Sequence, residues 1–200
     1  MTTGIVLAAG EATRFPNKLL LPIAHDRIVI ESAINWLKAV TKHITVVVPL
    51  GDVLREVLTA RGHDLHYVTQ PVARGVPDAI QLCAGYVRDH ALVTFGDNVY
   101  DWETVRAYET YGTVRKYEHD ADMDGWCGPY GWVERGHPDK TLTFAGHMLL
   151  SRWQMEQADE TQSTVRFMNE IKLCHELSES RWYDLGTPER YLRYVREEMS

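Results

Sequence analysis

Two positively charged residues, Arg14 and Lys18, follow the first apolar run of the chain, within the segment VLAAGEATRFPNKLLLPI at residues 6–23. An arginine fork can hold two phosphate oxygens at once, and a lysine ammonium group is a compact point charge. The small residues at 8–10 let a planar base and its phosphates approach the backbone closely. This combination favours a triphosphate-binding loop, with a pair of exposed loop cations as the alternative. The P-loop pattern GxxxxGK(S/T) and the dinucleotide pattern GxGxxG are both absent.

Apolar runs typical of buried strands alternate with helical patterns through the first half of the chain. Strands are predicted at 4–9, 44–49, 65–71 and 91–97, and helices at 27–40, 52–62 and 75–90. The second half predicts strands at 113–119, 130–135, 141–150 and 182–186, a Gly/Asp-rich turn at 120–131, and helices at 164–173 and 187–199. We therefore expect one α/β domain over residues 1–200, a three-layer sandwich whose mostly parallel central sheet carries helices on both faces. Ligands bind such sheets beyond the carboxyl ends of the strands.

Composition narrows the class of partner and the compartment. The chain has 21 Lys and Arg against 28 Asp and Glu, a formal net charge of −7. This argues against nucleic-acid and membrane-surface partners, because both need a basic footprint. Three scattered cysteines without a CxxC pair are typical of a reducing compartment. With no signal-peptide pattern and no apolar run of about 20 residues, we expect a cytoplasmic protein.

The segment LAAGEATRFPNKLLLPI resembles the signature loop of the nucleotidylyltransferases, written loosely as LAAG-x-x-x-R…K-x-L-x-P. The resemblance implies a Rossmann-like (GT-A-like) fold and the transfer of a nucleotidyl group from an NTP. It assigns catalytic roles to Arg14 and Lys18. The nucleotide-binding residues that it implies in this loop are Leu7, Ala8, Ala9 and Gly10.

A second segment, TQPVARGVPDAI at 69–80, is similar to the base-binding segment of the sugar-1-phosphate nucleotidylyltransferases. The resemblance assigns Gln70 and Gly75 to base recognition. A side-chain amide can read a pyrimidine edge with one donor and one acceptor, and a glycine leaves room for the ring. The alternative is an ordinary strand, turn and helix.

Two acidic residues stand in further segments of this kind. TFGDNVYD at 94–101 resembles the GDN of the thymidylyl- and uridylyltransferase group, and WYDLGTPERY at 182–191 resembles the closing W-x-D-x-G-T-P-E segment. The resemblance makes Asp97 catalytic and makes Asp97 and Asp184 ligands of a Mg²⁺ cofactor. A carboxylate at a strand end is a rigid mount for a hard cation. A shared ion requires these two distant residues to meet; the alternative is that each only shapes a turn or a helix entry.

Segments resembling the acceptor pocket complete the pattern. PYGWVERG at 129–136 and FAGHMLLS at 144–151 are similar to stretches that border this pocket, and Trp132 is the aromatic residue best placed to stack on a sugar. The family's usual Glu-Lys-Pro motif between them is missing, so Lys140 or Arg135 is expected to hold the acceptor phosphate. The acceptor-binding residues implied in this way are Tyr130, Gly131, Glu134, Lys140 and Gly146.

The resemblances imply a Mg²⁺-dependent reaction between an NTP, with dTTP or UTP favoured, and a phosphorylated small-molecule acceptor. A sugar 1-phosphate acceptor would give an NDP-sugar and pyrophosphate. The short interval from Arg14 to Lys18 is closer to the molybdenum-cofactor nucleotidylyltransferases, which take CTP or GTP, so that branch is an alternative. A non-catalytic nucleotide-binding or regulatory homologue and a glycosyltransferase are further alternatives. The base, the acceptor and the oligomeric state, a homo-oligomer included, stay open.

Overall fold

The computed structural model of the chain describes residues 2–10, 13–100, 112–116, 126–128, 131–133, 142–173, 176–177 and 182–199. Its helices are α1 (Val29–Lys38), α2 (Leu54–Ala60), α3 (Val76–Cys83), α4 (Arg152–Glu156), α5 (Thr164–Glu170) and α6 (Pro188–Glu198), with 3₁₀ turns at Lys18–Leu20 and Ala84–Tyr86. Its strands are β1 (Thr2–Leu7), β2 (Pro22–Ala24), β3 (Arg27–Ile28), β4 (Ile44–Pro49), β5 (His66–Gln70), β6 (His90–Phe95), β7 (Asn98–Tyr100), β8 (Gly112–Lys116), β9 (Trp126–Gly128), β10 (Gly131–Val133), β11 (Leu142–Ser151), β12 (Glu176–Leu177) and β13 (Trp182–Asp184).

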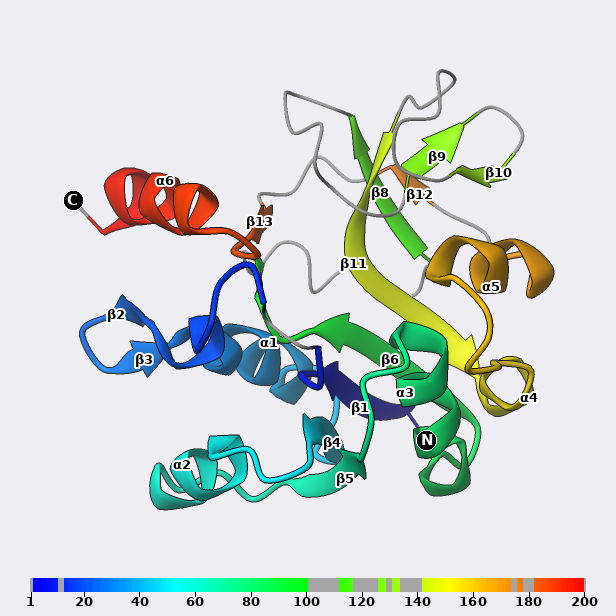
Figure 1. Cartoon of the computed structure of the whole chain (residues 1–200), viewed down its shortest axis with the longest axis horizontal. Coiled ribbons are helices and arrows are strands. Elements are labelled where there is room, and N and C mark those ends of the chain that lie inside the picture. Colours follow the sequence, from blue (N-terminus) through cyan, green and yellow to red (C-terminus); the bar gives the residue numbers. More distant parts are fainter. Residues whose placement is uncertain are drawn as a thin grey trace.

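The central sheet runs in the order β10-β9-β11-β6-β1-β4-β5, with β8 pairing β11 and β12 pairing β8. Strands β5, β4, β1 and β6 are parallel to one another, whereas β11 runs antiparallel to β6 (Figure 1). In this register Leu7 of β1 stands opposite Val47 and Phe95, so the parallel strands end at one edge of the sheet. The predicted α/β fold with a mostly parallel central sheet is confirmed.

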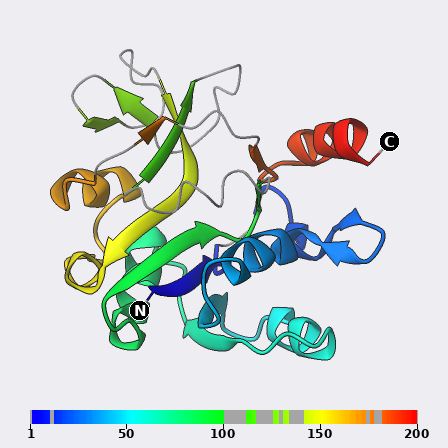
Figure 2. The same cartoon turned by 180° about the vertical axis from the view of Figure 1, so that it is seen from behind.

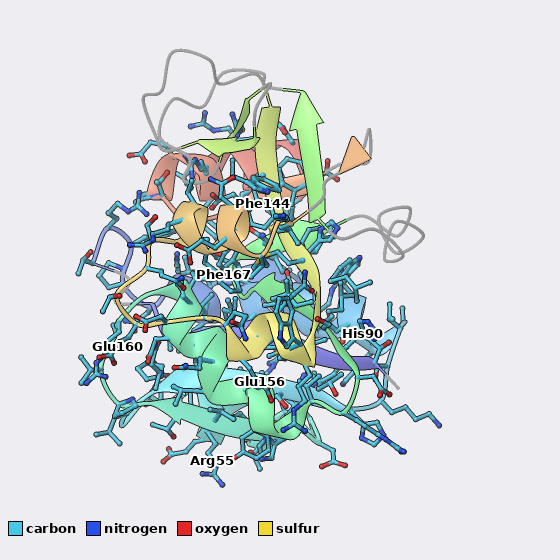
Figure 3. All side chains as sticks on the ribbon, turned by 90° about the vertical axis from the view of Figure 1, so that its right-hand side faces the viewer. Arg55, His90, Phe144, Glu156, Glu160 and Phe167 are labelled. Carbon is cyan, nitrogen blue, oxygen red and sulfur yellow. The ribbon has the colours of Figure 1, made fainter. Side chains whose placement is uncertain are left out.

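Helices cover both faces of the sheet because successive side chains of a strand point to opposite sides. In β1, Ile5 and Leu7 belong to a buried core shared with α3, α4 and α5, whereas Val6 belongs to a core shared with α1 and α2. Figure 2 shows α1 on the second of these faces. Phe144 of β11 and Phe167 of α5, both labelled in Figure 3, are buried in the first core. The arrangement is a three-layer sandwich.

The C-terminal segment returns to the first half of the chain. Strand β13 pairs with β7 in antiparallel orientation, and α6 lies beside the hairpin of β2 and β3 (Figures 1 and 2). The Tyr191 hydroxyl donates to the carbonyl oxygen of Pro22 at 2.8 Å. A small buried cluster that includes Ile23, Leu185 and Tyr194 joins α6 to the hairpin. These contacts fix the position of the segment that carries Asp184.

The helix predicted at 27–40 begins two residues later than expected, at Val29. Arg27–Ile28 instead forms β3 and pairs with β2. The physical reason is a local cap, because the Glu31 carboxylate accepts the N–H of Ile28 at 2.9 Å and closes the first helical turn there. The apolar spacing of the segment was correct, but spacing alone does not locate a cap.

Two further expectations were wrong in part. The turn predicted at 120–131 contains strand β9, whose backbone groups pair with β10 and β11. The helix predicted at 75–90 ends at Cys83, is followed by a 3₁₀ turn, and gives way to β6 at His90. Pro77 does lie in the first turn of α3, as predicted. Among the described residues, none of the helices has the length and apolar character needed to span a bilayer.

Candidate functional site

Lys18 and Asp97 meet at the edge where β1 and β6 end. The sequence predicts strands ending at Ala9 and Asp97, but β1 ends at Leu7 and β6 at Phe95, so both segments leave the sheet as loops. The Lys18 ammonium group donates to Oδ2 of Asp97, and each side chain is 18% exposed. A positive and a negative group therefore lie together at the carboxyl edge of the parallel strands, in a partly buried position.

The loop that carries Lys18 is anchored on the core. Asn17 adopts φ 56° and ψ 14°, a left-handed conformation that asparagine tolerates better than most residues. It leads into the 3₁₀ turn Lys18–Leu20, in which Leu19 and Leu20 pack against the core shared with α1. The apolar residues after Lys18 thus hold the cation at the strand edge, as the sequence pattern indicates.

Strand β13 brings Asp184 next to Asp97. Asp184 stands opposite Asn98 in the pairing of β13 with β7, and the Leu185 N–H donates to the Asp97 carbonyl oxygen at 2.9 Å. A Cβ atom added to Gly186 would lie 2.7 Å from Asp184 Oδ1 and 3.6 Å from Asp97 Oδ2. Both carboxylates therefore face one small space, and the long-range contact that a shared ion requires is present.

Each oxygen of Asp184 has a fixed partner. The Gly186 N–H donates to Oδ1 at 2.6 Å, and Arg190 Nη1 donates to Oδ2 at 2.9 Å. Burial and, after it, the negative charge of Asp97 raise the pKa of Asp184 to about 6, although Arg190, the Gly186 N–H and Lys18 act in the opposite direction. Two carboxylates held this closely favour an additional positive charge between them.

A cavity of about 650 Å³ opens beside Lys18 and Asp97, which both line it. Its volume is in the range of small-molecule and cofactor sites. The structure brings every predicted nucleotide-binding residue to the wall of this cavity: Leu7, Ala8, Ala9, Gly10, Gln70 and Gly75.

Gln70 differs from its predicted role in one respect. Its side-chain nitrogen donates to the Gly75 carbonyl oxygen at 3.1 Å and to Asp78 Oδ2 at 2.6 Å. An amide NH₂ has two hydrogens, so these two acceptors within the protein use both. The prediction that Gln70 offers a base one donor and one acceptor was therefore wrong for the donor. The carbonyl oxygen Oε1 is the group of this side chain that remains for a base.

A second cavity of about 420 Å³ adjoins the first. Arg14, Gly146 and Asp184 line the second cavity. The predicted cation Arg14 is thus separated from Lys18, which lines the first cavity. The residues that line both cavities are Gly75, Val76, Phe95 and Asp97.

Gly146 has a packing role beside its predicted acceptor role. Its φ of 79° lies in the left-handed region, and an added Cβ would lie 1.8 Å from Nδ2 of Asn98. Asn98 is 2% exposed and donates to the Tyr100 hydroxyl at 2.9 Å, so it cannot move aside without breaking this contact. Close approach of the two backbones at this point therefore requires a glycine.

The remaining acceptor predictions have mixed outcomes. Tyr130, Glu134 and Lys140, and with them Arg135, lie outside the described residues. Gly131 lies in β10, opposite Gly128 of β9. The expectation that Trp132 stacks on a sugar was wrong, because its side chain is buried in the core and its Nε1 donates to the Leu173 carbonyl oxygen at 2.9 Å.

Sequence reasoning missed two buried polar residues beside the site. Arg190, which holds Asp184, lines the second cavity, and Asp78, which holds Gln70, lies behind the wall of the first. Each occupies the first turn of a helix and lies within a segment that was assigned a site role on account of another residue. A side chain in the first turn of a helix points back toward the end of the preceding strand. This position in the sequence is the feature that could have indicated both residues.

The fold, with a cavity at the carboxyl edge of its parallel strands, belongs to a nucleotidyltransferase domain. Residues 4–118, more than half of the chain, match the family model described as the MobA-like NTP transferase domain. The chain belongs to this family, and the resemblance to the nucleotidylyltransferases is confirmed. Comparison with curated proteins gives no match.

Solved structures show the same fold. A protein from Bacillus anthracis described as a glucose-1-phosphate thymidylyltransferase, in complex with a sucrose, aligns with a TM-score of 0.85 at 20% identity, covering 98% of this chain and 94% of that one. HddC from Yersinia pseudotuberculosis aligns with a TM-score of 0.76 at 16% identity, covering 98% and 99% of the two chains.

Proposed function

We propose that this protein transfers the nucleotidyl group of an NTP, with dTTP or UTP favoured, to a sugar 1-phosphate and releases pyrophosphate. The observation that carries the proposal is the shared wall of the two cavities, where Asp97 lines both. A nucleotide in the first cavity and a phosphorylated acceptor in the second would meet at this residue. Lys18 on one side and Asp184 on the other frame the meeting point.

In this reaction an oxygen of the acceptor phosphate attacks the α-phosphorus of the NTP in line. The bond from the α-phosphorus to the bridging oxygen breaks, and pyrophosphate leaves with the electron pair. Positioning and charge neutralisation supply most of the rate of such a transfer, because little covalent help is needed. Lys18 neutralises the α-phosphate, and the exposed guanidinium of Arg14 adds a positive charge to the wall of the second cavity, where the acceptor phosphate would enter.

Asp97 and Asp184 suit a Mg²⁺ ion as cofactor. Both supply hard oxygen ligands toward one space, and Mg²⁺ is commonly held by one or two carboxylates together with substrate phosphates. Within the described residues no group of three or more His, Cys, Asp or Glu side chains could hold a metal ion by itself, so substrate phosphates would have to supply the remaining ligands. When bound, the ion would neutralise charge on the reacting phosphates. Arg190 and Gly186 keep Asp184 in position for it.

The lining of the second cavity supports a sugar acceptor. It is lined by the polar residues Gln162, Ser163 and Thr164, which precede or begin α5. Such groups suit the hydroxyls of a sugar, and Arg190 adds a positive charge at the same cavity. The similarity to a Bacillus anthracis protein described as a thymidylyltransferase for glucose 1-phosphate points in the same direction.

A molybdenum-cofactor nucleotidylyltransferase is the second candidate. It is favoured by the family description and by the short interval from Arg14 to Lys18. Its acceptor would be molybdopterin and its nucleotide CTP or GTP. The two candidates share the phosphoryl-transfer chemistry and differ in the molecule that fills the second cavity.

A substrate screen tests both candidates. The purified protein is incubated with Mg²⁺ and each of dTTP, UTP, GTP, CTP and ATP, in combination with a panel of sugar 1-phosphates or with molybdopterin. We expect pyrophosphate only when dTTP or UTP and a sugar 1-phosphate are both present, and loss of product when EDTA removes the metal. Product with molybdopterin and CTP or GTP would support the second candidate, and no pyrophosphate from any pair would reject both.

An Asp97→Asn variant tests the meeting point. Removing one charge of this kind typically lowers the rate on the order of 10²–10³-fold, and we expect a loss of this size without loss of the fold. Asp64→Asn, at an exposed position, is the matched control because it makes the same chemical change away from both cavities. Normal turnover by purified Asp97→Asn would contradict the assignment.

A further inference from the structure

The orientation of the Gln70 amide is set by its surroundings. Gln70 is 3% exposed, and its nitrogen lies within hydrogen-bond distance of Gly75 O and Asp78 Oδ2. A carbonyl oxygen and a carboxylate both accept hydrogen bonds, so the NH₂ end of the amide must face them. Exchanging the amide oxygen and nitrogen would place oxygen against two acceptors in a buried position, which is strongly unfavourable.

Asp78 is well placed to maintain this orientation. It is 7% exposed and lies in the first turn of α3, where the helix dipole favours a negative charge. A carboxylate there accepts hydrogen bonds but cannot donate one. Gly75, at the N-cap of the same helix, adopts φ 94° and supplies the second acceptor through its backbone. The turn 70–78 therefore works as one unit that holds the amide from two sides.

We propose that Asp78 is a positioning residue that selects the base by leaving Gln70 only its carbonyl oxygen to offer in the nucleotide cavity. This inference rests on the proposed function. An acceptor at this position requires an N–H on the base. Uracil and thymine carry such a group at ring nitrogen N3, whereas N3 of cytosine is itself an acceptor. Between the pyrimidines the site thus favours a 4-oxo base and disfavours cytosine, because two lone pairs would face each other.

Nucleotide binding tests the first part of the inference on the unmodified protein. Isothermal titration calorimetry in the presence of Mg²⁺ gives dissociation constants for UTP, CTP and N3-methyl-UTP without need of an acceptor. We expect UTP to bind about tenfold more tightly than either of the other two, since both lack the N3–H. Equal affinity for UTP and CTP would overturn the proposal.

An Asp78→Asn variant tests the second part. An asparagine side chain can turn its own NH₂ toward Gln70, which allows the Gln70 amide to reverse and present its nitrogen to the base. We expect the UTP-to-CTP affinity ratio to fall severalfold toward one, whereas Asp64→Asn, the same change at an exposed position, keeps the ratio of the unmodified protein. Weaker binding of both nucleotides with an unchanged ratio would reduce Asp78 to a structural role and overturn the proposal.

The outcomes separate this inference from the proposed reaction. Selective binding of UTP without pyrophosphate release would support base selection and contradict the transferase activity. Pyrophosphate formed equally from UTP and CTP would support the activity and contradict base selection by Gln70. Should Asp78→Asn fail to fold, as judged by circular dichroism, Asp78→Ser replaces it as a variant whose side chain can donate to Gln70, and the comparison of UTP, CTP and N3-methyl-UTP on the unmodified protein still decides what Gln70 offers to the base.

Discussion

The ammonium group of Lys18 contacts the carboxylate of Asp97, and this contact joins the loops that follow β1 and β6. We predict that Lys18→Ala lowers kcat on the order of 10²–10³-fold, because a preorganised positive charge is lost where the phosphate reacts. The melting temperature should change little, since both side chains keep contact with solvent. Pyrophosphate release at saturating substrate and thermal unfolding measure the two effects. Lys42→Ala, exposed and remote from both cavities, should leave both unchanged; unaltered kcat in Lys18→Ala would contradict the role.

Gly146 is required by packing, so its replacement should cost stability. In Gly146→Ala the new methyl group would lie 1.8 Å from Asn98 Nδ2, and φ 79° is strained for alanine. We expect a loss of about 2–4 kcal/mol in the free energy of unfolding. Urea titration followed by circular dichroism measures it. The matched control is Gly85→Ala, where an added Cβ meets nothing within 4 Å; equal stability of the two variants would show that Asn98 moves freely.

Glu31 stabilises the fold above acidic pH. Burial alone would raise the pKa of Glu31, but hydrogen bonds from Arg61, His63 and the Ile28 N–H outweigh it and lower the pKa to about 2. A depressed carboxyl pKa contributes stability that is complete above the unfolded value near 4.5 and disappears as the pH falls toward 2. The contribution is on the order of 2–3 kcal/mol. The free energy of unfolding, measured by urea titration between pH 7 and pH 2.5, should therefore fall more steeply with decreasing pH below pH 4.5.

Glu31→Gln isolates this contribution. The variant should be less stable than the unmodified protein at pH 7 and should lose less stability between pH 4.5 and pH 2.5. Glu56→Gln, at an exposed position of α2, makes the same change outside the network and should retain the full acid dependence. Identical pH profiles for Glu31→Gln and the unmodified protein would refute the prediction.

His147 should produce a second pH effect at higher pH. Burial lowers its pKa to about 4, and its ring packs against Trp36 and Tyr100. Between about pH 6.5 and pH 4 the unfolded chain binds a proton that the folded chain does not, so stability falls by about 3 kcal/mol across this window as the pH decreases. In His147→Leu the free energy of unfolding should depend less on pH between pH 6.5 and pH 5. The control is His43→Leu, at an exposed position. If the free energy of unfolding of His147→Leu depends on pH as steeply as that of His43→Leu, the prediction is contradicted.

Much of the site could be predicted because its residues follow buried strands in short segments. Gln70 and Asp97 stand at or just beyond the end of an apolar run, Lys18 lies in the loop that follows the first run, and parallel strands end at one edge of a sheet. Asp78 and Arg190 could not be predicted in the same way. Their roles depend on how far each helix is rotated about its axis, which the packing of the whole chain determines.

The fold shows the same division between local and distant causes. The apolar spacing over 27–40 indicated a helix, but its start is set by Glu31, whose carboxylate is held by Arg61 at the far end of α2. Strand β9 lies in a polar stretch without a strand pattern and exists because β10 and β11 offer partners to its backbone. Short elements of this kind depend on neighbours rather than on their own residues.

The pairing of β13 with β7 has a consequence for how the protein is made. Asp97 and Lys18 are synthesised in the first half of the chain, whereas Asp184 reaches them only when the closing strand docks. While the ribosome is still elongating the polypeptide, the nascent protein can assemble its parallel strands but not the second acid. The enzyme is therefore expected to gain activity only after residues 182–198 have been synthesised and β13 has docked, so the docking of this strand follows the assembly of the parallel strands.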